Sequence, residues 1–382
     1  MTTGITLCLM VRNEEKYVES CIKSVYNIVD HIVIVDTGST DSTIEICRRY
    51  TDNVYEIPFN DDFSSIRNAT MDYATTPWIL FLDADEEFEP QEALKVVELV
   101  KTAQTDVYAY KVLRYNFFST GGWYSGRNVK LIRNDPNVRF RKKINESIEM
   151  SIQDIGKRVE SAPIVLNHYG HCRSVKERDE KSLRYIALME EQLKETPNDA
   201  IVEGYIGLIS RTLGRFDTAL ERTERALLMN PNSATLHSFR GHVLRSVNRN
   251  EEAQLSYRKA VEIRPSDAAA WNMIGVTQLT TGNFPEAINS FDKAILLEPI
   301  AIHAKINKGL AYQAMGEYEQ AVMCFVDVIE KNRGFLRENW LGKVECDPYR
   351  AFYYETIMQF AGLGYHLSYC QMKIEEPKVL SY

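Results

Sequence analysis

The first half of the chain alternates short apolar runs with segments of helical spacing. Buried strands are predicted at the apolar runs Ile5–Val11, His31–Val35, Val54–Ile57, Trp78–Leu82 and Val107–Tyr115. Between them, helical spacing of apolar residues predicts helices over Glu14–Tyr26, Asp41–Tyr50, Phe63–Ala74 and Pro90–Lys101. This strand–helix alternation predicts an α/β domain built on a mostly parallel, doubly wound sheet.

The second half repeats itself every 34 residues. The small residues Gly207, Gly241, Gly275 and Gly309 keep this step, and so do Ala219, Ala253, Ala287 and Ala321. Small residues allow two antiparallel helices to approach closely, and Pro231, Pro265 and Pro299 end the second helices because proline cannot continue the hydrogen-bond ladder. The pattern resembles the tetratricopeptide repeat, with three good copies over 198–299 and a degenerate fourth to about 333. Two readings of its role stay open: a scaffold, or a concave groove that holds a peptide.

These patterns divide the chain into four parts. We expect the α/β domain over 1–175, a linker helix over 176–197, the repeats over 198–333 and a C-terminal segment over 334–382. The last segment breaks the 34-residue period and is rich in aromatic residues. A terminal helical cap explains it, because stacked repeats need one, and a homodimer interface is the alternative.

Composition excludes several classes of protein. The 382 residues carry a net charge of −8, which argues against a nucleic-acid partner. No apolar run approaches the ~18–20 residues of a membrane span, and Met1–Met10 has no positive region typical of a signal peptide. The seven cysteines form no Cys-x-x-Cys pair, which argues against a disulfide framework. We therefore expect a reduced, cytoplasmic protein.

Acidic residues follow three of the predicted strands. Arg12–Glu15 follows the first strand, Asp36–Asp41 the second and Asp83–Glu87 the fourth. Ligands gather at the carboxyl ends of strands in such sheets. Asp83 and Asp85 would point to one side near solvent, where their oxygens suit Mg²⁺ or Mn²⁺. Alternatively, these residues are helix caps and a solvated acidic loop.

Four segments together resemble family 2 glycosyltransferases of the GT-A fold. They are Ile5–Glu15, Ile32–Thr43, Asp62–Ala74 and Trp78–Asp85, and the resemblance covers about residues 4–175. The combination with tetratricopeptide repeats is similar to bacterial peptide glycosyltransferases of the sublancin S-glycosyltransferase type. The resemblance implies an inverting enzyme that uses a nucleotide-sugar donor.

The resemblance also implies roles for individual residues. It places Asn13 and Glu14 against the nucleotide, Asp36 at its base or ribose, and Arg67 at its phosphate end. It places Asp83 near the ribose and the metal, and it makes Asp85 a metal ligand. The metal, Mn²⁺ or Mg²⁺, would bridge the diphosphate and act as a Lewis acid.

Three further residues are candidates: Glu146 and His168 from positions where relatives carry characteristic elements, and Trp123 from a glycine pair that precedes two aromatic residues. Relatives often have His-Glu after a basic strand, here Val138–Lys143, and this chain has Asn145-Glu146. Glu146 is the candidate general base, and a surface glutamate is the alternative. His168 would complete the metal shell or contact the diphosphate, unless it is a hydrogen-bonded residue between sheet and linker helix. Trp123 would stack on a sugar from a mobile loop, or else anchor the core.

The leading hypothesis is therefore a metal-dependent glycosyltransferase with a UDP-sugar donor. The acceptor would be a Ser, Thr or Cys side chain of a peptide or protein bound with help from the repeats. A glycan or lipid-linked acceptor is one alternative. A non-catalytic repeat scaffold with a nucleotide-binding domain is the other.

Overall fold

The computed structural model describes residues 3–118, 123–172, 174–331 and 362–375. It contains two compact units, of which the first comprises residues 1–117 and 125–171 and the second residues 118–124 and 172–382. The α/β domain lies in the first unit and the helical repeats lie in the second, so the predicted fold class is confirmed. Over the described ranges, no helix has the length and apolarity to cross a membrane.

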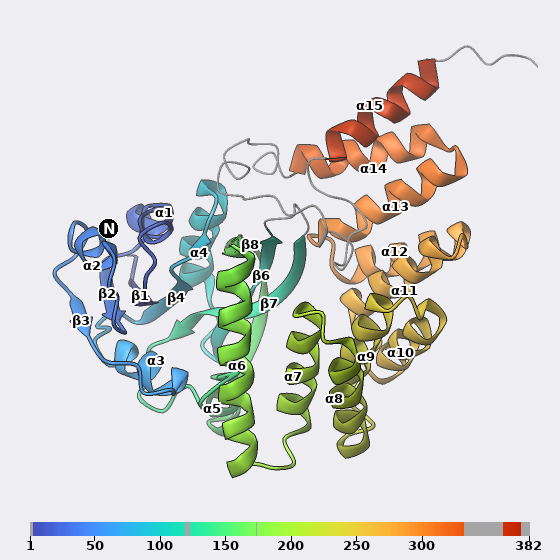
Figure 1. Cartoon of the computed structure of the whole chain (residues 1–382). Helices are drawn as coiled ribbons and strands as arrows, with labels where there is room; N and C mark the ends of the chain where they lie inside the picture. The colour runs from blue at the N-terminus through green and yellow to red at the C-terminus, as the bar shows by residue number, and fades with distance from the viewer. Residues whose placement is uncertain (1–2, 119–122, 173, 332–361, 376–382) are drawn as a thin grey trace, which may run out of the picture. The chain divides into compact units, whose positions relative to one another are not determined.

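One eight-stranded sheet organises the first unit, in the order β3-β2-β1-β4-β7-β6-β8-β5 (Figure 1). Its four N-terminal strands pair in parallel, as the apolar runs predict, whereas β7 is antiparallel to β4 and β5 is antiparallel to β8. The strands are β1 (Ile5–Val11), β2 (His31–Asp36), β3 (Val54–Glu56), β4 (Trp78–Asp83), β5 (Glu86–Glu87), β6 (Val107–Phe118), β7 (Trp123–Arg133) and β8 (Arg158–His171). The helices of this unit are α1 (Val18–Val25), η1 (Tyr26–Ile28), α2 (Thr43–Arg48), α3 (Phe63–Asp72), α4 (Pro90–Thr102) and α5 (Glu149–Asp154).

Alternate residues of the central strands belong to two separate cores. Leu7 and Leu9 of β1 lie in a core that includes residues of α1 and α4. Cys8, between them, lies in a second core with Met71 of α3 and Ile152 of α5. Because successive side chains of a strand point to opposite faces, helices cover both faces of the sheet. This layering leaves the strand ends as the place for polar side chains.

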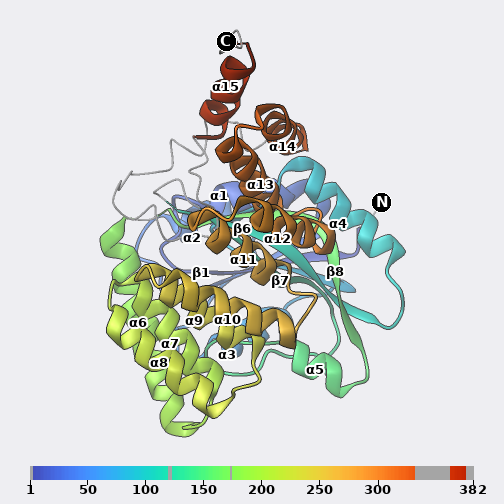
Figure 2. The same cartoon turned by 90° about the vertical axis from the view of Figure 1, so that its right-hand side faces the viewer.

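In the second unit, α6 (Val175–Glu195) begins one residue earlier and ends two residues earlier than the predicted linker helix 176–197. A capping box fixes its start, since the Ser174 hydroxyl accepts from the Glu177 backbone and the Glu177 carboxylate accepts from the Ser174 backbone. Four helix pairs follow, each packed on the next (Figure 2). They are α7 (Ala200–Thr212) with α8 (Phe216–Met229), α9 (Ala234–Ser246) with α10 (Asn250–Ile263), α11 (Ala268–Thr280) with α12 (Phe284–Leu297), and α13 (Ile302–Met315) with α14 (Tyr318–Lys331).

Close helix contact explains the 34-residue glycine spacing. A Cβ atom on Gly241 would lie 2.6 Å from the ring of Tyr257, and Gly309 faces Phe325 in the same way. The fourth pair, which the sequence predicts as degenerate, thus keeps the contact that defines the other copies. The glycine is required because no side chain fits between the two helices.

A helix at the end of the described chain covers part of the last repeat. In α15 (Gly362–Glu375), the His366 Nδ1 atom lies 2.8 Å from Oε1 of Gln313 in α13. Tyr369 packs edge-on against Tyr318 of α14. These contacts support a terminal cap for this helix, while the rest of the predicted segment 334–382 lies outside the described residues.

Acid should destabilise the repeat unit through His303. This side chain is 3% exposed, and burial lowers its pKa to about 4. The unfolded chain therefore binds more protons than the folded chain between pH 6.5 and pH 4, so stability falls as the pH is lowered through that window. We expect His303 to contribute a loss on the order of 2 kcal/mol between pH 7 and pH 5. His242, whose pKa is lowered to about 3 by burial and by Arg211 and Arg245, should add a loss of similar size. Urea unfolding at both pH values measures the total, and His303→Gln should lose roughly half as much stability as the parent. An equal loss in the variant and the parent would assign the effect to other groups.

Candidate functional site

The polar ends of three parallel strands meet at one edge of the sheet, as the sequence predicts. In the register of the sheet, Val11 at the end of β1 pairs with Asp36, and Met10 pairs with Asp83. Asn13 and Glu14 follow β1 directly. The segments that carry most of the predicted site residues are therefore neighbours.

Asn13 and Asp36 hold the loops that follow β1 and β2. The Asn13 Oδ1 atom accepts from the Thr40 backbone at 2.7 Å. The Asp36 carboxylate is 1% exposed and accepts from the backbone N–H groups of Gly38 and Ser39, both at 2.9 Å. The backbone N–H of Glu14 donates to the hydroxyl of Thr43 at 2.7 Å. These bonds shape the edge of the site, and contact with a nucleotide stays a prediction for all three residues.

Three cations surround Asp83. Its carboxylate lies 3.2 Å from Lys130 Nζ, 3.1 Å from Arg67 Nη2 and 3.7 Å from Arg114 Nη1. Burial alone would raise the pKa of this carboxyl group, but Lys130, Arg67, Arg114 and His168 together hold the pKa well below its ordinary value. Asp83 is therefore ionised, and its part in metal binding stays a prediction.

Arg67 joins Asp83 to the candidate general base. Its Nε atom donates to Glu146 Oε1 at 2.7 Å while its Nη2 atom donates to Asp83 Oδ1 at 3.1 Å. The guanidinium also lies over the rings of Phe81 and Phe140, at 4.7 and 5.5 Å from their centroids. Burial lowers the pKa of Arg67, but Glu146 and Asp83 outweigh it and raise the pKa above its ordinary value. Arg67 thus holds two carboxylates in fixed positions.

The loop that carries Glu146 is fastened to α3. Asn68 exchanges two hydrogen bonds with the backbone of Phe140, at 2.8 and 3.0 Å, and the Phe63 backbone donates to the Lys143 carbonyl at 2.9 Å. The predicted basic strand Val138–Lys143 is wrong, because in this segment only Arg141 forms a bridge, with Ser147. Asn68 thus makes hydrogen bonds to the backbone of this segment that a neighbouring strand would otherwise make. Arg67 places Glu146 near Asp83.

Asp85 and His168 form a second polar pair. His168 Nε2 lies 3.3 Å from Asp85 Oδ1, and His168 Nδ1 lies 2.8 Å from the side-chain oxygen of Asn116. With Nδ1–H donating to Asn116, Nε2 presents a lone pair to the carboxylate. A Cβ atom on Gly170 would lie 2.6 Å from both Asp85 Oδ2 and His168 Nε2, so only glycine leaves room for this pair.

This pair fits a divalent cation. Two acceptors that face each other at 3.3 Å repel unless a cation or a proton lies between them. Over the described ranges, no group of three or more His, Cys, Asp or Glu side chains is arranged to hold a metal ion. Mg²⁺ or Mn²⁺ would therefore take two protein ligands here, with phosphate and water as the others. Asp85 is 5% exposed, so the expectation that it lies near solvent is wrong: the pairing of β5 with β8 covers it.

Sequence reasoning missed Lys130, Arg114 and Glu86. These three side chains come from β7, β6 and β5. Lys130 and Arg114 each form ion pairs with both Glu86 and Asp83. One signal in the sequence could have found Lys130, which is 4% exposed. It is a charged residue at a position of an alternating strand pattern that faces the buried side. Trp123 begins β7, and its side chain lies outside the described part of the structure.

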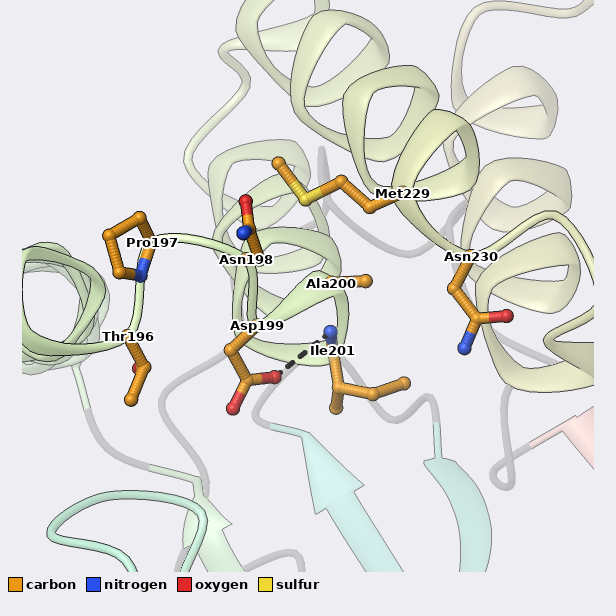
Figure 3. Close-up of a pocket in the computed structure, with 8 residues that line it drawn as sticks. All are labelled: Thr196, Pro197, Asn198, Asp199, Ala200, Ile201, Met229 and Asn230. Carbon is orange, nitrogen blue, oxygen red and sulfur yellow. Dashed lines mark hydrogen bonds between the residues drawn. The ribbon is translucent and has the colours of Figure 1, made fainter.

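A hollow in the repeat unit has a different composition. It has a volume of about 650 Å³ and lies where α7 begins and α8 ends (Figure 3). The lining residues are Thr196, Pro197, Asn198, Asp199, Ala200, Ile201, Met229 and Asn230. Asp199 accepts from the backbone of Ile201 and caps α7, so the one carboxylate of this hollow serves the helix. The charged side chains that could act on a substrate therefore lie at the sheet edge and not in this hollow.

Parts of both halves of the chain match known protein families. Residues 6–162 match glycosyl transferase family 2, and residues 240–302 and 302–333 match tetratricopeptide repeat families. The first match contains Asp36, Arg67, Asp83, Asp85 and Glu146. The site residues at the sheet edge therefore lie within the matched domain, except for His168 and Gly170 on β8.

Three relatives show how far the similarity extends. The chain is 31% identical over 209 residues to a TPR repeat-containing protein of Synechococcus elongatus. The aligned part is 53% of this chain and 51% of that protein. It is 27% identical over 229 residues to the SPbeta prophage-derived glycosyltransferase SunS of Bacillus subtilis, with coverages of 59% and 54%. It is 30% identical over 144 residues to the lipopolysaccharide core biosynthesis glycosyltransferase LpsC of Rhizobium meliloti, with coverages of 37% and 51%. The chain thus spans about half the length of these relatives.

Proposed function

We propose that this chain, in which a family 2 glycosyltransferase domain precedes tetratricopeptide repeats, is an inverting, metal-dependent glycosyltransferase. The donor is a nucleotide-sugar, in the first place a UDP-sugar. The acceptor is the side chain of Ser, Thr or Cys in a peptide or protein. The observation that carries this proposal is the joining of Asp83, Glu146 and the Asp85–His168 pair at one sheet edge.

The arrangement supports displacement of a nucleoside diphosphate. Mn²⁺ or Mg²⁺ held by Asp85 and His168 would neutralise the charge that develops on the leaving diphosphate. Asp83 lies at the end of β4, beside the loops held by Asn13 and Asp36, where it would contact the ribose. Glu146 would take the proton of the acceptor, because a carboxylate within hydrogen-bond reach of a hydroxyl can act as a general base.

The repeats support a polypeptide acceptor. Stacked helix pairs form extended surfaces that suit a peptide, and a repeat-containing relative and the glycosyltransferase SunS both align with more than half of this chain. A glycan acceptor is the second candidate, because LpsC, a lipopolysaccharide core enzyme by name, also aligns with this chain.

Release of free nucleotide tests the proposed activity. The protein is incubated with UDP-sugars and Mn²⁺, and UDP is measured with and without a mixed library of peptides that contain Ser, Thr and Cys. We expect slow UDP release alone, faster release with the library, and a hexose mass shift on some peptides. Donor binding without turnover of any UDP- or GDP-sugar would instead favour the non-catalytic scaffold.

A matched pair of arginines tests the role of the repeats. Arg245 is half-buried on α9, the first helix of its pair, and Arg258 is exposed on α10, the second. If the acceptor lies along the first helices, Arg245→Glu should change peptide transfer at least ~10-fold, since one charged contact is worth roughly 1.5–3 kcal/mol. Donor hydrolysis without peptide should stay the same, and Arg258→Glu should change neither rate. If both variants transfer sugar to peptide at the same rate, α9 does not take part in acceptor recognition.

A further inference from the structure

We infer that Glu86 is the positioning residue of this site, which fixes Asp83 and two cations relative to the Asp85–His168 pair. The inference rests on the proposed function, because it concerns the same site. In this role, Glu86 would hold the side chains of the site in the positions that bind a divalent cation together with a nucleoside diphosphate.

Glu86 makes three contacts from a fully covered position. Its side chain is 0% exposed, and its Oε2 atom accepts from the Asp83 backbone at 2.9 Å and from Lys130 Nζ at 2.6 Å. Its Oε1 atom accepts from Arg114 Nη1 at 3.2 Å. A buried carboxylate is costly unless it is paired, and this one is paired on both oxygens. A covered side chain does not touch a substrate, so its role is to hold other groups.

The backbone of Glu86 reaches the second part of the site. Glu86 lies opposite His168 in the pairing of β5 with β8, and the Tyr169 backbone donates to the Asp85 carbonyl at 2.9 Å. The residue therefore holds Asp83 with its side chain and the Asp85–His168 pair with its main chain. A change in the Glu86 side chain alters the first connection and leaves the second intact.

Two cations, Lys130 and Arg114, are each shared between the carboxylates of Glu86 and Asp83. Lys130 lies 2.6 Å from Glu86 and 3.2 Å from Asp83, and Arg114 lies 3.2 and 3.7 Å from the same residues. If Glu86 loses its charge, Lys130 and Arg114 each lose this ion pair and keep the one with Asp83. Asp83 would then be drawn toward them, and positive charge would be left next to the divalent cation. Both effects weaken cation binding, and loss of such outer partners typically costs 10–100-fold in metal affinity.

A second buried glutamate provides the control. Glu203 on α7 is also 0% exposed and pairs with two arginines, Arg222 at 3.3 Å and Arg225 at 2.6 Å. Glu86→Gln and Glu203→Gln therefore remove the same charge from equally buried, doubly paired positions, one at the site and one in the repeats. A purely structural effect should appear in both variants.

The experiment measures Mn²⁺ binding in the presence of UDP from the spectroscopic signal of free Mn²⁺. We expect Glu86→Gln to bind Mn²⁺ at least ~10-fold more weakly than the parent, and Glu203→Gln to bind within about twofold of it. If Glu86→Gln folds poorly, the double variant Glu86→Gln/Lys130→Met also removes the buried cation that Glu86 pairs with. This variant should fold, yet still bind Mn²⁺ at least ~10-fold more weakly.

Four results overturn the inference or separate it from the proposed function. Mn²⁺ binding by Glu86→Gln equal to that of the parent would overturn the inference, and so would an equal loss in Glu203→Gln. A parent protein that binds Mn²⁺ with UDP but turns over no donor would overturn the proposed function alone, and the binding comparison would still decide the role of Glu86. No Mn²⁺ binding by the parent would overturn both.

Discussion

Replacing Asp85 by alanine is expected to lower metal-dependent sugar transfer by at least ~10³-fold. A Lewis acid at a leaving group contributes several kcal/mol to the transition state, and each 1.36 kcal/mol is a factor of ten in rate. In Asp85→Ala, His168 Nε2 loses the carboxylate that lies 3.3 Å away, so one ligand remains where two are needed. The measurement is donor hydrolysis and transfer over a range of Mn²⁺ concentrations.

Two further variants make the Asp85 result specific. Asp85→Asn keeps the shape of the buried side chain and removes its charge, so it should lose metal-dependent transfer without a change in thermal stability. Asp106→Ala removes an exposed carboxylate that pairs with Arg158 elsewhere in the same unit, and it should stay near the parent. Transfer by Asp85→Ala within a few-fold of the parent at all Mn²⁺ concentrations would exclude Asp85 as a metal ligand.

Glu146→Gln should slow transfer to a hydroxyl acceptor by at least ~10²-fold, because general-base catalysis typically contributes 10²–10⁴. The amide oxygen of glutamine can still accept from Arg67 Nε, which lies 2.7 Å from Glu146 Oε1, so the loop should keep its position. UDP and Mn²⁺ should bind as in the parent. A Cys acceptor should show a smaller loss, since a thiol ionises more readily near neutral pH.

Glu149→Gln is the matched control for Glu146. Glu149 lies three residues further on and pairs with Lys111 at 2.8 Å, away from Arg67. Its substitution should leave transfer to a hydroxyl within about twofold of the parent. The opposite outcome, loss in Glu149→Gln and near-normal transfer in Glu146→Gln, would move the general base to Glu149.

Local patterns predicted most of the fold. The apolar runs and the helical spacing found the first four strands and the helices between them, because burial on both faces gives parallel strands a near-continuous apolar sequence. The 34-residue spacing found all four helix pairs, since Gly241, Gly275 and Gly309 must admit a ring of the second helix and Gly207 must admit Thr223. The turns within the helix pairs repeat as well. Gly214, Gly282 and Gly316 have positive φ angles there, and Asn248 of the second pair has a φ of 60°.

The electrostatics of the site depend on pairings that the sequence does not reveal. Lys130 and Glu86 lie 2.6 Å apart although 44 residues of chain separate them, because β7 and β5 enter the sheet by antiparallel pairing with distant strands. The family resemblance implies a strand over the basic segment 138–143, but Asn68 of α3 bonds to its backbone at Phe140 instead. The sequence does not show why residue 170 is glycine, since the need for space arises only once Asp85 and His168 face each other.

The guanidinium of Arg67 is a single rigid link between two carboxylates. It donates to Glu146 through Nε and to Asp83 through Nη2, so a ligand that drew Asp83 away would change the hydrogen bonding of Glu146 as well. If Asp83 contacts the donor and Glu146 the acceptor, as we propose, the binding of one substrate would alter the affinity for the other through this one side chain. By linkage, the two substrates would then change each other's affinity by the same factor.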